Sequence, residues 1–209
     1  MAHDGGELDQ WRLENVLQGL AGMPKGQSFA AATKEAEGVP AGSGSLLFLP
    51  YLNGERTPHA DPKARGAFVG MNLTHDRAAM TRSVMEGITL ALRDSLDIIE
   101  SLGVPVRQIR ASGGGSKNEL WRQMQADVFG KKITTLKVEQ GAAYGVALLA
   151  AVGDGAYRNI ASACAATIEV AAETKPDAKA KATYNRLFPV YRDLYLRLSD
   201  SMHTLADMQ

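Results

Sequence analysis

Apolar residues in this chain recur either at helical spacing or in short continuous runs. The first stripe with helical spacing consists of Leu8, Trp11, Leu13, Val16, Leu17 and Leu20. A second, short helix is predicted over 29–36, and a long one over 76–102. Apolar runs at 46–49 and 67–71 predict two short strands, and the segment 50–65 between them is rich in proline and other turn residues.

The long helix predicted over 76–102 has a recognisable start and end. Thr74 or Asp76 can cap its first turn, and Gly103 followed by Pro105 is a typical stop. Its inner side is expected to consist of Val84, Ile88, Ala91, Leu92, Ile99 and Leu102.

Strands and helices alternate in the second half of the chain. Apolar runs at 106–111 and 132–138 predict strands, and the segment 116–129 between them predicts a helix. Ser116 and Glu119 stand at the spacing of a capping box at its start. Such alternation is typical of an α/β domain.

The last quarter of the chain gives weaker signals. The segment 142–152 is almost wholly apolar and predicts a buried helix. Beyond Ile160 the chain is rich in alanine, and helical spacing returns over 184–198. Pro189 is expected to kink or restart that last helix.

Length and composition exclude several classes of protein. A chain of 209 residues is long enough for one substantial domain with its own core. Lys+Arg and Asp+Glu balance at 23 each, so no global field favours nucleic acid or an anionic membrane. The single cysteine, Cys164, excludes an intramolecular disulfide and a cysteine-based zinc site. No signal peptide or membrane span is evident, and a soluble cytoplasmic protein is expected.

The most informative local feature is a run of glycines between a predicted strand and a predicted helix. Ser112-Gly113-Gly114-Gly115 follows the strand directly, and such a turn lets a nucleotide approach the backbone closely. The same glycines also suit a strand that packs tightly on a helix, and both interpretations stay open. Asn118 stands where the dinucleotide fingerprint needs a glycine, and no Walker motif occurs.

Other catalytic patterns are missing from the sequence. It contains neither H-E-x-x-H nor G-x-S-x-G. The histidines are scattered and never stand at ligand spacing; they are His3, His59, His75 and His203. They are expected to be surface or capping residues. Glu86 and Asp127, on predicted helices, are expected to form salt bridges or caps rather than to catalyse.

Five segments, in a fixed order along the chain, carry a recognisable pattern. They are Leu47–His59 (LFLPYLNGERTPH), Arg65–Met71 (RGAFVGM), His75–Gly87, Ser112–Trp121 (SGGGSKNELW) and Gly141–Ala147 (GAAYGVA). Together they resemble segments of bacterial xylulokinases, which are members of the FGGY carbohydrate kinase family. The resemblance covers most of residues 1–200 and is densest from 44 to 157.

The resemblance implies a fold of two ribonuclease-H-like domains hinged around a cleft, as in actin and Hsp70-type ATPases. Sugar lies mainly on the first domain of such kinases and ATP mainly on the second. Residues 1–209 resemble the second, C-terminal domain, with no counterpart of its first three strands. The phosphate loop D-x-G-[ST] and the catalytic aspartate of the first, sugar-binding domain likewise have no counterpart in these residues.

The same resemblance supplies candidate nucleotide-binding residues. Gly114 and Asn118 match positions that contact the nucleotide in related kinases, and Gly113 accompanies them in the turn. Gly6 and Gln10 match a second nucleotide-contacting pair in the glycerol kinase branch, although a helix-packing role for Gly6 stays equally open. The loop from Asn53 to Pro58 is expected to be structural. No residue here is expected to be catalytic or to bind a metal.

The resemblance therefore predicts the nucleotide-binding half of a sugar kinase that uses ATP and Mg²⁺. The expected reaction converts D-xylulose and ATP into D-xylulose 5-phosphate and ADP, and this chain alone is expected to be inactive. Gluconate, ribulose or glycerol kinases are alternatives within the family. A non-catalytic nucleotide-binding or interaction module is an alternative of another class. The missing domain is the expected partner, and an uncovered apolar face is expected to favour a homo-oligomer.

Overall fold

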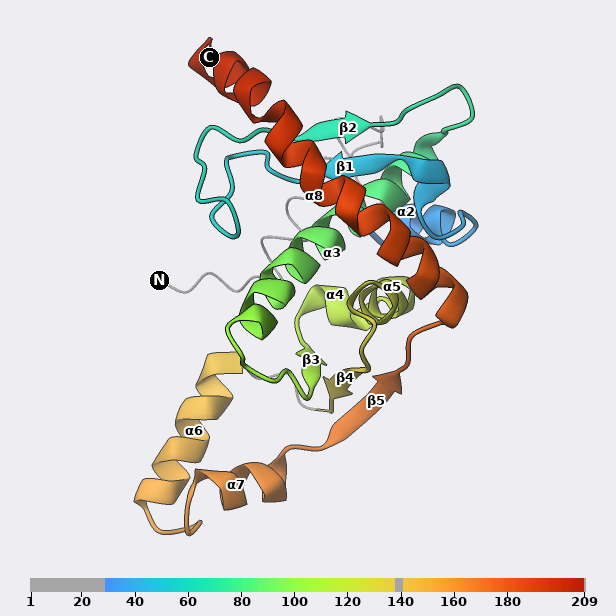
Figure 1. Cartoon of the computed structure of the whole chain (residues 1–209). Coiled ribbons are helices and arrows are strands. Elements are labelled where there is room, and N and C mark those ends of the chain that lie inside the picture. The colour runs from blue at the N-terminus through green and yellow to red at the C-terminus, as the bar shows by residue number, and fades with distance from the viewer. Residues whose placement is uncertain (1–28, 138–140, 209) are drawn as a thin grey trace.

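The described part of the chain, residues 29–137 and 141–208 of a computed structural model, consists of helices packed around two small sheets. Its elements are α2 (Phe29–Ala36), the 3-10 turn η1 (Ser43–Ser45), β1 (Leu47–Leu49), β2 (Ala67–Val69), α3 (Arg77–Ser101), β3 (Ile109–Ala111), α4 (Gly114–Lys117), α5 (Glu119–Phe129), β4 (Ile133–Leu136), α6 (Gly141–Gly153), α7 (Ile160–Thr167), β5 (Val170–Thr174) and α8 (Ala178–Asp207). The long helices α3 and α8 cross beside β1 (Figure 1). The helix predicted around residues 8–20 lies outside the described residues.

Helix α3 forms the centre of the larger core. It begins where the sequence predicts a cap, because Asp76 Oδ1 accepts the backbone N–H of Ala79 at 2.9 Å. Its N-terminal half packs directly on β1, which pairs with β2 in an antiparallel hairpin. A Cβ atom at Gly87 would lie 2.1 Å from the carbonyl oxygen of Phe48. Only glycine therefore allows the helix and the strand to approach this closely.

The expected inner face of α3 is correct only in its first half. Val84 and Ile88 are buried, whereas Leu92, Ile99 and Leu102 are 42%, 44% and 76% exposed. Figure 1 shows the reason: the C-terminal turns of α3 extend beyond β1. The apolar spacing continues there, but the described elements place no sheet against it.

The second sheet has the order β3-β4-β5. β3 and β4 are parallel, with Ile109 opposite Ile133, and the connection through α4 and α5 is the crossover that parallel strands require. β5 runs antiparallel to β4 on the other side. Both β3 and β4 are shorter than predicted, and β5 was not predicted. Nearly all of β5 is exposed, so neither face of the strand needs apolar residues. Its sequence, Val-Ala-Ala-Glu-Thr, therefore lacks the alternation of apolar and polar residues that would have predicted a strand.

The single helix predicted over 116–129 is wrong at its start. Asn118 has extended backbone angles (φ −85°, ψ 119°) and separates α4 from α5. It also replaces Ser116 as the capping residue, since asparagine satisfies free backbone N–H groups well and its Oδ1 accepts Trp121 N–H at 2.9 Å. The Ser116 hydroxyl instead donates to the carbonyl oxygen of Gly113 at 2.8 Å.

Helix α6 is not buried as its apolar sequence predicts. Leu148 is 6% exposed, but Val146 and Leu149 are 65% and 60% exposed. A helix that is apolar all round needs cover on every side. Among the described elements α6 packs chiefly on α7, and Figure 1 shows this pair standing away from the larger helix layer.

Helix α8 continues through Pro189, so of the two expectations for this position, a kink or a restart, the restart is wrong. Buried side chains before and after this position anchor it to the core; they are Tyr184, Phe188, Tyr191 and Met202. These contacts offset the loss of one backbone hydrogen bond at the proline. Among residues 29–137 and 141–208, no helix combines the length and the apolar character that crossing a membrane would require.

Candidate functional site

The glycine turn connects the end of β3 to two successive helices. Gly113 adopts a positive φ of 76°, which favours glycine over any residue with a side chain. Its carbonyl oxygen accepts the backbone N–H of Ser116 at 3.1 Å, which closes the turn. Gly114 then begins α4. Backbone without side chains is therefore presented at the carboxyl end of a parallel strand, where α/β proteins commonly bind ligands.

Asn118 occupies the junction between α4 and α5 and bonds in two directions. Its Oδ1 accepts Trp121 N–H, and its Nδ2 donates to Thr33 Oγ1 at 2.9 Å. Thr33 lies on α2, 85 residues earlier in the chain, and is 2% exposed. The side chain of Asn118 is thus held by its own helix and by a buried residue of a distant one.

Two residues of α5, Trp121 and Arg122, form hydrogen bonds that support the glycine turn. The guanidinium of Arg122 donates through Nη1 to the carbonyl oxygen of Ser116 at 2.6 Å. Trp121 is 2% exposed, and its Nε1 donates to Thr89 Oγ1 on α3 at 3.0 Å. The turn is therefore connected to α3 by hydrogen bonds through buried side chains, and these restrict its movement.

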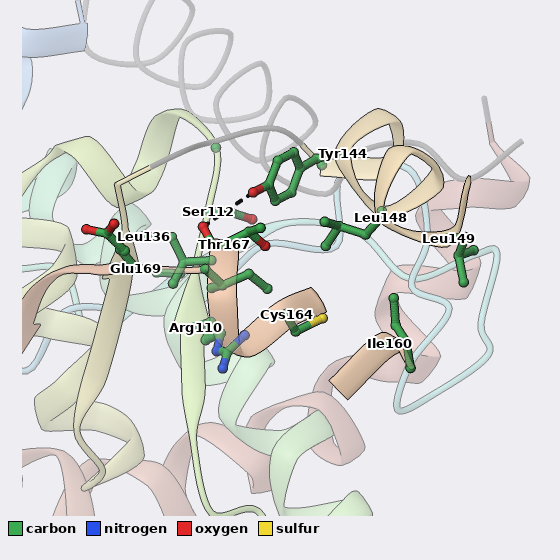
Figure 2. Close-up of a pocket in the computed structure, with 15 residues that line it drawn as sticks. Arg110, Ser112, Leu136, Tyr144, Leu148, Leu149, Ile160, Cys164, Thr167 and Glu169 are labelled. Carbon is green, nitrogen blue, oxygen red and sulfur yellow. Dashed lines mark hydrogen bonds between the residues drawn. The ribbon is translucent and has the colours of Figure 1, made fainter. Parts of the chain in front are cut away.

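A cavity of about 620 Å³ lies on one side of the turn. Its walls come from the end of β3, the turn itself, the end of β4, α6, α7 and the two residues between α7 and β5; Figure 2 labels Arg110, Ser112, Leu136, Tyr144, Leu148, Leu149, Ile160, Cys164, Thr167 and Glu169. The Tyr144 hydroxyl donates to the carbonyl oxygen of Thr167 at 3.3 Å and so links α6 to α7. Apolar side chains form most of the wall.

The charged groups at the rim of this cavity already have partners. Lys137 donates to Glu169 at 2.5 Å, and this bond lowers the pKa of the Glu169 carboxyl. Arg110 donates through Nε to the side chain of Gln108 at 3.1 Å. These contacts leave the cavity suited to an apolar or aromatic group rather than to a bare ion.

The structure brings some of the predicted site residues together and separates others. Gly113 lines the cavity, and Gly114 follows it directly in the chain. Asn118 lies further along, at the start of α5, and does not line the cavity. Gly6 and Gln10 lie outside the described residues, so their expected nucleotide contacts stay predictions.

The described histidines make structural contacts within the fold, and two of these contacts join distant segments. His75 accepts the backbone N–H of Asn72 through Nδ1 at 2.9 Å. His59 stacks on the ring of Tyr195 at 3.5 Å, and burial lowers its pKa. His203 Nε2 lies 2.7 Å from Asp61 Oδ2, and this bond helps to lower the pKa of Asp61 to about 2.

Glu86 and Asp127 also have the structural roles predicted for them. Glu86 is 2% exposed and forms an ion pair with Arg82 at 2.8 Å. Asp127 accepts the backbone N–H of Asp177 at 2.6 Å and the side-chain amide of Gln123 at 2.8 Å. Burial raises the pKa of Asp127, while these bonds oppose that effect. Both carboxylates are occupied by neighbours within the fold.

Sequence reasoning missed the residues that support the turn from a distance. Thr33 is separated from Asn118 by 85 residues, and no local pattern connects the two. Tyr144 belongs to the apolar helix α6, and its bond to Thr167 depends on the unpredicted helix α7. Trp121 could have been found, because it stands three residues after Asn118, where an N-cap side chain meets the backbone.

No metal centre is evident in the described part of the chain. Within residues 29–137 and 141–208, no three side chains of His, Cys, Asp or Glu are arranged to hold a metal ion.

The sequence of this chain matches a known protein family and known relatives. The family model described as "FGGY family of carbohydrate kinases, C-terminal domain" matches residues 4–153. A xylulose kinase from Bacillus subtilis (strain 168) is 40% identical over 174 residues, which cover 83% of this chain and 35% of that protein. The chain thus spans about a third of the length of this relative.

Solved structures agree with the sequence matches. A gluconate kinase and a ligand-bound xylulose kinase, both from Lactobacillus acidophilus, each superimpose with a TM-score of 0.85 at 32% identity. In each case the match covers 93% of this chain and 39% of the solved chain. The predicted fold class, an α/β domain of the ribonuclease-H-like type found in actin-related ATPases, is confirmed by this similarity.

Proposed function

Since the chain belongs to the FGGY family of carbohydrate kinases and carries its C-terminal domain, we propose that it is the nucleotide-binding half of an ATP-dependent sugar kinase, a xylulokinase. The observation that carries this proposal is the braced glycine turn from Gly113 to Asn118, which exposes backbone at the end of a parallel strand. In the proposal, the adenosine part of ATP lies against Gly113 and Gly114, within reach of Asn118.

The chemistry of phosphoryl transfer explains why such a half can lack catalytic groups. Catalysis of this reaction consists mainly of positioning and of stabilising charge on the transferred phosphoryl group. This chain would hold the nucleotide, and the acceptor sugar and the base for its hydroxyl would belong to the sugar-binding domain. Mg²⁺ would arrive bound to the phosphates of ATP, as it commonly does. We place the enzyme in the cytoplasm, where ATP is available.

The proposed substrate is D-xylulose and the product D-xylulose 5-phosphate. The 40% sequence identity between this chain and a xylulose kinase supports this choice. Gluconate kinase is a second candidate, because the solved gluconate kinase superimposes equally well.

Substitutions at Asn118 test the nucleotide site. Asn118→Asp keeps an oxygen that can cap α5 but removes the amide nitrogen, so we expect weaker ATP binding with a nearly unchanged melting temperature. Asn118→Ala removes both groups and is expected to weaken ATP binding and to cost about 1 kcal/mol of stability as well. Calorimetric titration with ATP and thermal unfolding measure the two effects separately.

A control for these variants is available in the same fold. Asp177→Ala removes the N-cap of α8, where Asp177 Oδ1 accepts Ala180 N–H at 2.8 Å, away from the glycine turn. It should lower stability by about 1 kcal/mol without changing ATP affinity. Unchanged ATP affinity in both Asn118 variants would contradict the placement of the nucleotide.

The exposed face of α6 leads us to propose that the chain self-associates when it is alone in solution. Exposed apolar patches favour association, and Val146 and Leu149 are the most exposed large side chains of this helix. Leu149→Glu is therefore expected to shift dimers toward monomers in sedimentation velocity. Leu205→Glu, at an exposed position of α8, should have no such effect. Equal shifts in the two variants would exclude α6 as the contact.

A further inference from the structure

We propose that Thr33 is a positioning residue for nucleotide selection: its hydroxyl holds the amide of Asn118 in the orientation that favours adenine over guanine. This inference rests on the proposed function, in which ATP binds beside the glycine turn. Thr33 itself would not touch the nucleotide. It would act through Asn118.

The direction of the Asn118 amide is fixed by its two hydrogen-bond partners. The backbone N–H of Trp121 can only donate, so the atom that it meets at 2.9 Å must be the amide oxygen. The nitrogen end then points to Thr33 Oγ1, also at 2.9 Å. Turning the amide over would place two N–H donors against each other at Trp121. The two ends of the side chain are therefore distinguishable.

The Asn118 amide keeps the capacity for two further hydrogen bonds. A side-chain amide has two N–H donors and an oxygen with two lone pairs. Trp121 uses one lone pair and Thr33 accepts one N–H; among the described residues the amide makes no other hydrogen bond, so one donor and one acceptor remain. Adenine offers the complementary pair, an amino donor beside a ring-nitrogen acceptor, and asparagine reads it with two bonds. Guanine presents an oxygen acceptor where adenine has its amino group.

Thr33 adds to the helix cap by fixing the nitrogen end of the Asn118 amide. The bond to Trp121 N–H anchors only the oxygen end, and the side chain could still swing about that anchor. Thr33 supplies the second point of attachment and is itself rigid. It is 2% exposed, and its helix neighbours Ala32 and Ala36 are packed in the hydrophobic core. The position of the amide nitrogen is thereby set by the core of the domain.

The experiment compares ATP and GTP binding to the 209-residue chain by calorimetric titration. Thr33→Val removes the hydroxyl and keeps the shape of the side chain. We expect it to weaken ATP binding about fivefold, the effect of one hydrogen bond, and to leave GTP binding unchanged. The preference for ATP over GTP should fall by the same factor. Thr33→Ser keeps the hydroxyl and should retain the preference.

Thr81→Val is the matched control. It removes another buried threonine hydroxyl, which donates to the carbonyl oxygen of Arg77 on α3 at 2.9 Å and takes no part in the hydrogen bonds described around the glycine turn. It should lower the melting temperature and leave the nucleotide preference unchanged. Equal weakening of ATP and GTP binding in Thr33→Val, or loss of the preference in Thr33→Ser, would overturn the role of the hydroxyl. If the unmodified chain bound neither nucleotide, the proposed function would fall together with this inference.

Discussion

A Glu86→Gln substitution is expected to lower the free energy of unfolding by about 3–5 kcal/mol, because it leaves a buried guanidinium without its counter-charge. Glu86 Oε1 accepts Arg82 Nε at 2.8 Å, and their side chains are only 3% and 9% exposed. The same carboxylate accepts Gly42 N–H at 2.9 Å and the hydroxyls of Ser43 and Tyr184 at 2.8 Å. Burial raises the pKa of Tyr184, which remains a neutral donor.

The measurement is chemical denaturation of the two proteins at neutral pH, with a matched exposed pair as the control. Arg77 also pairs with a glutamate, Glu35, but their side chains are 41% and 37% exposed. Glu35→Gln should therefore cost at most about 1 kcal/mol. Similar losses in Glu86→Gln and Glu35→Gln would show that the buried carboxylate does not hold α3, the 42–43 turn and α8 together.

The 209-residue chain is expected to show no sugar-dependent release of ADP when ATP, Mg²⁺ and D-xylulose are supplied in excess. Correct placement of two reactants contributes about 7–11 kcal/mol to such a reaction, and the proposal assigns the sugar and its base to another domain. Fusing to this chain the whole N-terminal part of a xylulokinase that it does not match should restore turnover, with D-xylulose preferred over gluconate and glycerol. A coupled assay of ADP release measures both proteins.

The possible outcomes of this assay separate the competing functions. Sugar-dependent turnover by the chain alone would contradict the half-enzyme proposal. A preference for gluconate in the fused enzyme would change only the identity of the sugar. A fused protein that binds ATP but never turns over would favour a non-catalytic nucleotide-binding module.

Much of the fold could be predicted because its signals are local. The cap at Asp76 and the stop at Gly103 mark the ends of α3 within a few residues, and the alternation around β3 and β4 indicates the α/β class. The errors arise where tertiary contacts decide. Apolar spacing predicts that Leu102 and the residues of α6 are buried, but burial depends on whether another element covers them.

In the candidate site, too, residues with a local signal could be predicted and residues joined by distant contacts could not. The glycine turn could be found because glycines at a strand end have a direct backbone consequence at Gly113. The family resemblance then supplied Gly114 and Asn118 as nucleotide-binding candidates. Thr33 could not be found, since its contact with Asn118 joins segments 85 residues apart. Neither periodicity nor motif spacing carries information about such a pair.

The long sequence separation between α8 and its partners has a consequence for synthesis on the ribosome. Tyr184 follows Glu86 by 98 residues, and Tyr195 follows its partner Asp61 by 134. The nascent chain therefore emerges with the central carboxylate and the inner side of α3 still lacking the helix that covers them. Native packing around Glu86 can be completed only after α8 has left the exit tunnel, so this core forms only once all the elements from α2 to α8 have been synthesised.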